Sequence, residues 1–471
     1  MSKIEVDTID KQSGSTLTLG GSGTAVTLAS GATQTGFGRT GTVDWQTAIK
    51  TSTITVVNGE GYFVNTTGGA ITANLPAGSA GAIAAFRDYA NTFDSNALTV
   101  NSNGSEKING LTKDLIVSTE GESITLVYAD ATKGWLVVND GNNDAGVQAE
   151  FVTATGGNAT VTCGNFKTHI FTGPGTLCVS NAGNATGSTT VDYLVIAGGG
   201  GGGTVSGATG GGAGGFRVSN SYSIPAPTMS PLSNPTGLPV SVQSYTIAVG
   251  GGGPAGAAPN NPGTNGNVST FSTITSAGGG KGKGSLGGNG VGFAGASGGG
   301  ARGAPPGGPV SSGYAGGAGN TPPVSPSQGN NGGAGYDGFC QSTNGGGGGG
   351  AGAVGVNAGA SAGGAGGAGS YVADGFINPT SPSYGTPGPV SSTRFFSGGG
   401  GGTTCGGPGG QPVTFGVGGA GGGGAGASAA GSSGGSATVN TGGGGGGGIG
   451  NPASPGGAGG SGIVMIRYKF Q

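Results

Sequence analysis

VDYLVIAGGGGGG, at residues 191–203, joins an apolar strand-like segment directly to six glycines. A second apolar segment, GSGIVMIRY, follows near the end of the chain at residues 460–468. Both contain the β-branched residues that favour strands. Between them lie the glycine runs 250–253, 345–350, 398–402, 421–424 and 442–448. Because two strands bracket the glycine, we predict a folded domain in preference to a flexible linker.

The composition supports ordered packing. The chain has 471 residues, enough for two or three domains, with 122 glycines, 7% charged residues and a net charge of −2. Abundant glycine without a Gly-X-Y period is typical of low-complexity chains, but disordered chains usually carry many charges. Residues 198–461 contain few, namely Arg217, Lys281, Lys283, Arg302, Asp337, Asp374 and Arg394. A disordered chain with so few charges would have little to keep it soluble.

Several protein classes are disfavoured. The near-neutral charge argues against a nucleic-acid partner, whose phosphates require clustered Lys and Arg. No apolar run of about 18 residues predicts a transmembrane helix. The first residues lack the apolar core of a secretory signal, so we expect synthesis in a cytoplasm without export by the usual route. Four scattered cysteines make no disulfide scaffold; a Cys163–Cys178 bridge stays open, with free thiols preferred.

The chain divides into four parts. Residues 1–42 carry short alternations such as STLTL (15–19), which predict a β-rich arm whose apolar faces are covered by other copies. Residues 43–148 predict a small β-sandwich-like module with strands near 54–57, 62–64, 71–75, 97–100, 115–117, 124–128 and 135–138; only residues 82–89 admit a helical turn. Residues 149–197 predict a β linker module. Residues 198–471 form the glycine-rich domain, closed by a strand at 462–470.

Several motifs resemble the glycine-rich domain of bacteriophage tail fibre proteins, notably of marine phages. They are KTHIFT (167–172), GTLCV (175–179), DYLVIAGGG (192–200), GAGGFR (212–217), SYTIAVG (244–250), NVSTF (267–271), NTGGG (440–444) and GGSGIVMIRY (459–468). This resemblance covers roughly residues 150–470. The opening MSKIEVDTI (1–9) and the passage from ESITLV (122–127) to GW (134–135) are also similar to marine phage fibre proteins.

The glycine must be held by its backbone. Glycine loses about 0.5–1 kcal/mol more than alanine on entering regular structure, and it has no side chain to bury. Extended threefold helices leave every N–H and C=O pointing sideways, and each net hydrogen bond contributes about 1 kcal/mol. The resemblance to adhesins of T-even-like phages implies such a bundle of polyglycine II helices with variable loops at one end. The predicted fold is therefore mainly β, with packed polyglycine II helices and very little α-helix.

Aromatic residues interrupt the glycine, and rings together with arginine are typical of binding hot spots. The candidate receptor-binding residues are Tyr222, Tyr336, Phe339, Tyr371, Phe376, Tyr384, Arg394, Phe395 and Phe396. The alternative is that these rings fill a small core beneath the loops or a seam between copies. For residues 371–396 taken as one segment, we favour binding.

Catalytic chemistry is not indicated, and we predict neither an enzyme nor a cofactor or metal site. His169 is the single histidine and, without partners in the sequence, predicts a structural role. The many Gly-x-Gly-x-x-Gly matches are expected by chance, and none has the strand, helix and acidic partner of a dinucleotide site. Lys283 lacks the upstream glycine of a phosphate loop, because Ala277 occupies that position.

The resemblance implies a phage tail fibre or adhesin that attaches the virion to a bacterial receptor, either an outer-membrane protein or a polysaccharide. The expected partners are a homotrimer, a tail or adaptor protein at the N-terminus, and that receptor, with the protein located in the virion. The alternative is a purely structural virion fibre, such as a collar, whisker or fibre stem. An ice-binding or surface-adhesive role is less favoured, because the irregular loops offer no flat repetitive face.

Overall fold

The computed structural model describes residues 43–138, 149–185, 187–204, 207–257, 261–284, 290–303, 314–337, 343–377, 384–404, 414–429, 431–449 and 454–471. The predicted arm, residues 1–42, lies outside them. The described chain is mainly β, as predicted, and its single helix is the short α1 (Asp374–Ile377). Two compact units, residues 1–147 and 148–471, are described separately.

In the first unit the chain alternates between two sheets that enclose one apolar core containing Phe86, Leu98 and Trp135. One sheet, β1-β3-β5-β8-β9, comprises β1 (Asp44–Lys50), β3 (Glu60–Val64), β5 (Ile83–Asp88), β8 (Ser123–Asp130) and β9 (Gly134–Val137). The other, β2-β4-β6-β7, comprises β2 (Ile54–Thr55), β4 (Ile71–Asn74), β6 (Leu98–Asn101) and β7 (Leu115–Val117). Because successive strands enter opposite sheets, neighbours from β1 to β6 run parallel within each sheet. The strands predicted in this module are confirmed.

The expectation that residues 82–89 could form a helical turn is wrong, because this segment forms the central strand β5. Its alanines favour a helix by local propensity. β5, however, pairs with β3 on one side and β8 on the other, and ladder bonds on both sides outweigh that weak preference. Ala85 lies opposite Gly61, which the ring of Trp45 covers.

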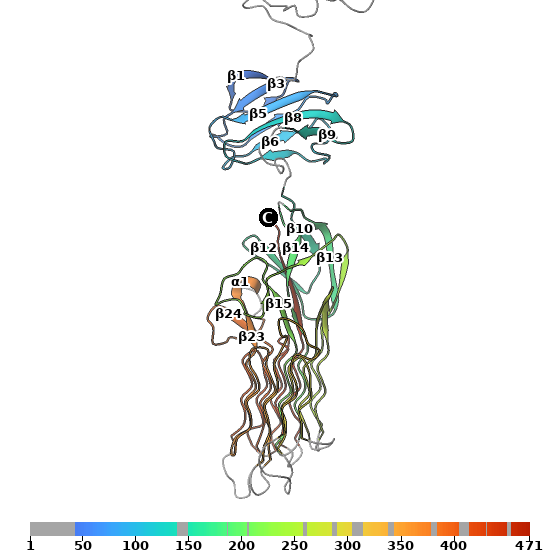
Figure 1. The fold of residues 1–471 in the computed structure, drawn as a ribbon, viewed down its shortest axis with the longest axis vertical. Coiled ribbons are helices and arrows are strands. Elements are labelled where there is room, and N and C mark those ends of the chain that lie inside the picture. Colours follow the sequence, from blue (N-terminus) through green and yellow to red (C-terminus); the bar gives the residue numbers. More distant parts are fainter. Residues whose placement is uncertain are drawn as a thin grey trace, which may run out of the picture. The chain divides into compact units, whose positions relative to one another are not determined.

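The second unit begins with two sheets that share a core (Figure 1). One sheet comprises β10 (Val152–Thr155), β13 (Gly175–Ala182), β18 (Ser244–Ala248), β19 (Ser269–Phe271) and β20 (Ile274–Ser276). The other comprises β11 (Ala159–Cys163), β12 (Phe166–Phe171), β25 (Ile463–Lys469), β14 (Thr190–Ile196), β15 (Phe216–Ser219) and β16 (Ser233–Asn234), with β17 (Leu238–Pro239) beside β14. Residues 149–197, predicted as a linker module, thus supply strands to both sheets.

The two apolar segments of the sequence meet at the centre of the larger sheet. β14 and β25 pair antiparallel, from Asp192 opposite Arg467 to Ile196 opposite Ile463. One face of the sheet packs on the smaller sheet. The opposite face packs on the segment that contains β23 (Ser370–Ala373), α1 and β24 (Thr393–Phe396). Burial on both faces explains why both strands are continuously apolar.

Beyond these sheets, the glycine segments run side by side as extended helices (Figure 1). In helix 198–203 the hydrogen bonds repeat every third residue. Its N–H groups donate in turn to the segments 264–267, 457–460 and 209–212, and its carbonyls accept in turn from 253–256, 279–282 and 445–448. A threefold helix bonded to six neighbours is the polyglycine II arrangement that we predicted.

Helix 398–403 repeats the pattern with other partners. It donates to the segments 421–424, 364–367 and 208–211, and accepts from 416–419, 345–348 and 444–447. The runs 198–203, 345–350, 398–402 and 442–448 are buried throughout. Glycine is required there because an added Cβ meets a neighbouring backbone carbonyl; at Gly200, for example, it would lie 2.3 Å from the oxygen of Gly280.

A clasp and an aromatic segment as the candidate functional site

The candidate contact residues are dispersed over the second unit. Six belong to residues 371–396, whereas Tyr222 follows β15 and Tyr336 lies on β21 (Tyr336–Asp337), which pairs with β22 (Thr343–Asn344). Phe339 lies outside the described residues. The described residues of the segment 371–396 pack on the larger sheet, and Tyr222 lies near Phe376 beside Arg467. Tyr336 belongs to a separate two-stranded sheet, so the candidate residues do not form one shared surface.

Three rings of residues 371–396 anchor this segment. Phe376 and Phe396 are fully buried against the larger sheet, beside Ile170 and Leu194. Phe395 is almost fully buried as well. Phe376 and Phe396 fill the small core that we considered as the alternative to binding, and Phe395 is covered by Tyr371 of its own segment. They therefore fix the shape of the segment and offer little surface for contact.

The remaining candidates of this segment are partly exposed. Tyr371 packs on Phe395, with ring centroids 5.0 Å apart. The guanidinium of Arg394 donates from Nε to the Tyr384 carbonyl at 2.9 Å and from Nη2 to the Gly385 carbonyl at 2.8 Å. Arg394 thus fixes the backbone that presents Tyr384. A receptor role for these residues stays a prediction.

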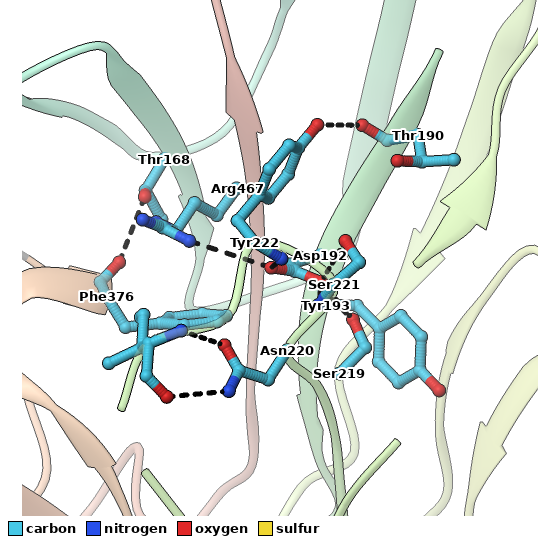
Figure 2. Close-up of polar contacts among 11 residues, drawn as sticks. Thr168, Thr190, Asp192, Tyr193, Ser219, Asn220, Ser221, Tyr222, Phe376 and Arg467 are labelled. Atoms are coloured by element: carbon cyan, nitrogen blue, oxygen red, sulfur yellow. Dashed lines mark hydrogen bonds and ion pairs between the residues drawn. The ribbon is translucent and has the colours of Figure 1, made fainter. Parts of the chain in front are cut away.

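Tyr222 is part of a packed cluster that the sequence reasoning missed. Its ring packs edge-on against Phe166 at 5.0 Å, and its hydroxyl donates to the Thr190 carbonyl at 2.7 Å. Beside it, buried Asp192 and Arg467 form an ion pair at 3.6 Å across the β14–β25 ladder (Figure 2). We call the ion pair of Asp192 and Arg467 the clasp.

Polar and aromatic groups surround the two charges of the clasp. Asp192 Oδ1 accepts hydrogen bonds from Ser219 Oγ and from the amide and hydroxyl of Ser221, each at 2.8 Å (Figure 2). The Arg467 guanidinium lies 3.7 Å from the ring centroid of Phe166 and 5.6 Å from that of Phe376. Burial lowers the pKa of Arg467, and the charge of Asp192 opposes this shift. The Asp192 carboxylate therefore accepts several hydrogen bonds, whereas Nε and Nη1 of Arg467 have no hydrogen-bond partner among the described residues.

Beside the clasp, the larger sheet is also hydrogen-bonded to residues 371–396, which we call the aromatic segment. Thr168 Oγ1, on β12, donates to the carbonyl of Phe376 at 3.0 Å (Figure 2). The signal for the clasp was present in the sequence, since Asp192 and Arg467 are the only charged residues within the segments 191–197 and 463–468. Their pairing became evident only once the strand register was known.

His169 occupies a separate buried network on β12, in agreement with its predicted structural role. Its Nδ1–H donates to the Gly156 carbonyl at 2.6 Å, and its Nε2 lies 2.9 Å from the Tyr468 hydroxyl, which also donates to the Ala154 carbonyl at 3.3 Å. The carbonyl can only accept, which places a proton on Nδ1. Burial lowers the pKa of His169 from 6.5, because the charged imidazolium loses hydration.

This depressed pKa predicts a pH dependence. The unfolded chain binds a proton at His169 below about pH 6.5, while the folded chain resists protonation. Protonation of His169 therefore leaves the free energy of unfolding unchanged above that pH. Below it, the free energy of unfolding decreases as the pH falls, with a slope of up to about 1.4 kcal/mol per pH unit. Urea unfolding between pH 7.5 and 5.5 measures it. His169→Gln should flatten the profile, and equal profiles in both proteins would contradict the prediction.

The described residues contain neither a cluster of metal-ligating side chains nor a membrane-spanning helix. Among them, no three His, Cys, Asp or Glu side chains gather where they could hold a metal ion. No helix in this part of the chain is long and apolar enough to cross a membrane. Cys163 and Cys178 carry free thiols, so the bridge left open from the sequence is not formed.

Residues 172–469 are the part of the chain that matches a known family. No curated protein matches the chain. The family model described as "Glycine-rich domain" matches these residues, which include β14, β25 and the glycine helices between them. The chain therefore belongs to the glycine-rich domain family.

Proposed function

We propose that this protein is a bacteriophage tail fibre or fibre-tip adhesin, located in the virion, that attaches it to a bacterial surface receptor. The observation that carries the proposal is the aromatic segment 371–396, anchored on a close-packed scaffold by buried rings. Tyr371, Tyr384 and Arg394 remain partly exposed there. Aromatic and arginine side chains on a rigid base lose little entropy on binding. A homotrimer attached to the tail or an adaptor through its N-terminus belongs to the same proposal.

Virion adsorption tests this proposal. In virions that carry the variant chain, Tyr371→Ala combined with Tyr384→Ala should slow adsorption about tenfold or more, as expected for hot-spot rings. Val242→Ala is the matched control, because this side chain is exposed and precedes β18 of the smaller sheet, on the other side of the larger sheet from residues 371–396. Melting of the purified proteins shows whether the fold survives. Normal adsorption by the tyrosine variant would favour the structural fibre (collar, whisker or stem) instead.

A further inference from the structure

Two lysines meet on one aromatic ring among the glycine helices. The ammonium of Lys281 lies 4.5 Å from the ring centroid of Phe293, and the ammonium of Lys283 lies 4.8 Å from the same centroid. Lys283 is 3% exposed, whereas Lys281 is partly exposed. Each contact is a cation–π interaction, so a single ring holds two like charges close together. We call Lys281 and Lys283 the lysine pair.

The lysine pair belongs to helix 277–284, which has one side without a neighbouring backbone bond. In two of its three directions, the N–H groups of this helix donate to backbone carbonyls of adjacent segments. In the third direction, the N–H of Lys281 donates to Oδ1 of the Asn265 side chain at 3.0 Å. In helix 198–203, by contrast, all three directions end on backbone carbonyls. Side chains therefore border helix 277–284 on the side where Lys281 is reached from solvent.

The second part of the chain is basic, although the whole chain has a net charge of −2. Its two acidic residues are Asp337 and Asp374, and neither lies in the segments 261–267, 277–284 or 290–295 around the lysine pair. Residues 198–471 have a net charge of +5, because they also contain seven basic residues, namely Arg217, Lys281, Lys283, Arg302, Arg394, Arg467 and Lys469. Such a charge asymmetry between two parts of a chain favours an anionic ligand.

The electrostatics of the lysine pair favour an anion at Lys281. Burial lowers the pKa of Lys283, and the positive charge of Lys281 lowers it further. An anion beside the two ammonium groups would offset this repulsion. Phosphate and sulfate groups offer several oxygens that accept charge-assisted hydrogen bonds from an ammonium. Lys281 can make that contact directly, while the buried charge of Lys283 adds positive potential behind it.

We propose that the lysine pair binds a phosphate or sulfate group of an anionic polysaccharide. The inference rests on the proposed function for the place of this polysaccharide, a bacterial surface, and adds a second contact to that of the aromatic segment. A polymer with repeated anionic groups is favoured over a single ion, because the positive charge is spread over residues 198–471 and repeated contacts raise the affinity. Nucleic acid is disfavoured, since its binders cluster more basic residues than two.

Binding of dextran sulfate to the purified full chain tests the inference, with neutral dextran as the reference polymer. Lys281→Gln combined with Lys283→Gln should weaken dextran sulfate binding about tenfold or more, because both ammonium groups are lost. Arg217→Gln combined with Lys469→Gln is the matched control: it removes the same charge from partly exposed positions elsewhere and should change the affinity less than about twofold. Calorimetric melting shows whether each variant is folded.

Acylation of lysines in the natural chain gives a second measurement that needs no variant. Dextran sulfate should slow the acylation of Lys281 about fivefold or more, since a bound ammonium is shielded from the reagent. Acylation of Lys469 should stay unchanged. Mass spectrometry of the digested protein reads both rates.

Three results would overturn the inference. Equal loss of affinity in the two double variants would show attraction by net charge alone. Protection of Lys281 by inorganic phosphate but not by dextran sulfate would identify a free ion as the ligand, and tighter binding of single-stranded DNA than of dextran sulfate would identify nucleic acid. Any of these, together with slowed adsorption of the Tyr371 and Tyr384 variant, would leave the proposed function standing. Normal adsorption of that variant with a functional lysine pair would contradict the aromatic segment alone.

Discussion

Gly201→Ala should destabilise the second unit by about 3 kcal/mol, the upper range for overpacking a rigid core. The new Cβ would lie 2.0 Å from the Pro254 carbonyl oxygen and 2.8 Å from that of Gly253, both of which are backbone atoms. The helix 198–203 is bonded on all sides, so it cannot shift without straining bonds to several neighbours. One methyl group in the bundle interior should therefore act like a large overpacking substitution.

Gly251→Ala is the matched control for this prediction. Gly251 belongs to a helix at the surface of the bundle, and its added Cβ would meet only Asn267 Nδ2, at 3.8 Å. We expect no loss, or a gain of about 0.5 kcal/mol, because alanine reduces the freedom of the unfolded chain. Both tryptophans, Trp45 and Trp135, lie in the first unit. Tryptophan fluorescence thus reports the first unit, and calorimetry resolves the second. Equal effects at positions 201 and 251 would contradict the close-packed bundle.

Asp192→Ala should cost the second unit about 3–5 kcal/mol, the range for breaking a buried ion pair from one side. The variant leaves a buried guanidinium that cannot lose its proton at neutral pH. Nε and Nη1 of Arg467 have no hydrogen-bond partner among the described residues, so Asp192 supplies their main compensation. Thermal and urea unfolding of the second unit measure the loss.

Arg467→Met is expected to cost less than Asp192→Ala. Methionine retains apolar contact with Phe166, and the Asp192 carboxylate keeps the hydrogen bonds from Ser219 and Ser221. Combining Asp192→Ala with Arg467→Met should recover part of the loss, since apolar replacement of a whole buried pair is often nearly neutral. Strictly additive costs would show that the two side chains are not coupled.

Local pattern was sufficient to predict much of the fold. Seven of the nine strands described in the first unit followed from alternation, and the apolar segments 191–197 and 463–468 were predicted to be strands. Strand β1 was not predicted, because its sequence DWQTAIK lacks clear alternation. The glycine helices followed from backbone hydrogen bonding, because glycine has no other means to offset its entropy. Local pattern failed at β5, where pairing on both sides outweighs the helical preference of alanine.

The candidate site depended more on tertiary contacts. Sequence singled out Phe376, Phe395 and Phe396 as possible contact residues, but an aromatic ring reads the same in a core and on a surface. Packing on the larger sheet buried Phe376 and Phe396, whereas Phe395 packs on Tyr371, which stays partly exposed.

The difference between what the sequence predicts and what only the tertiary structure shows has a physical reason. By itself, the sequence determined that glycine must form backbone-bonded threefold helices between two apolar strands, because composition and periodicity are properties of neighbouring residues. The tertiary structure alone decided that Asp192 meets Arg467, although they are 275 positions apart, through the β14–β25 register. That register depends on contacts between distant residues, which no local pattern encodes.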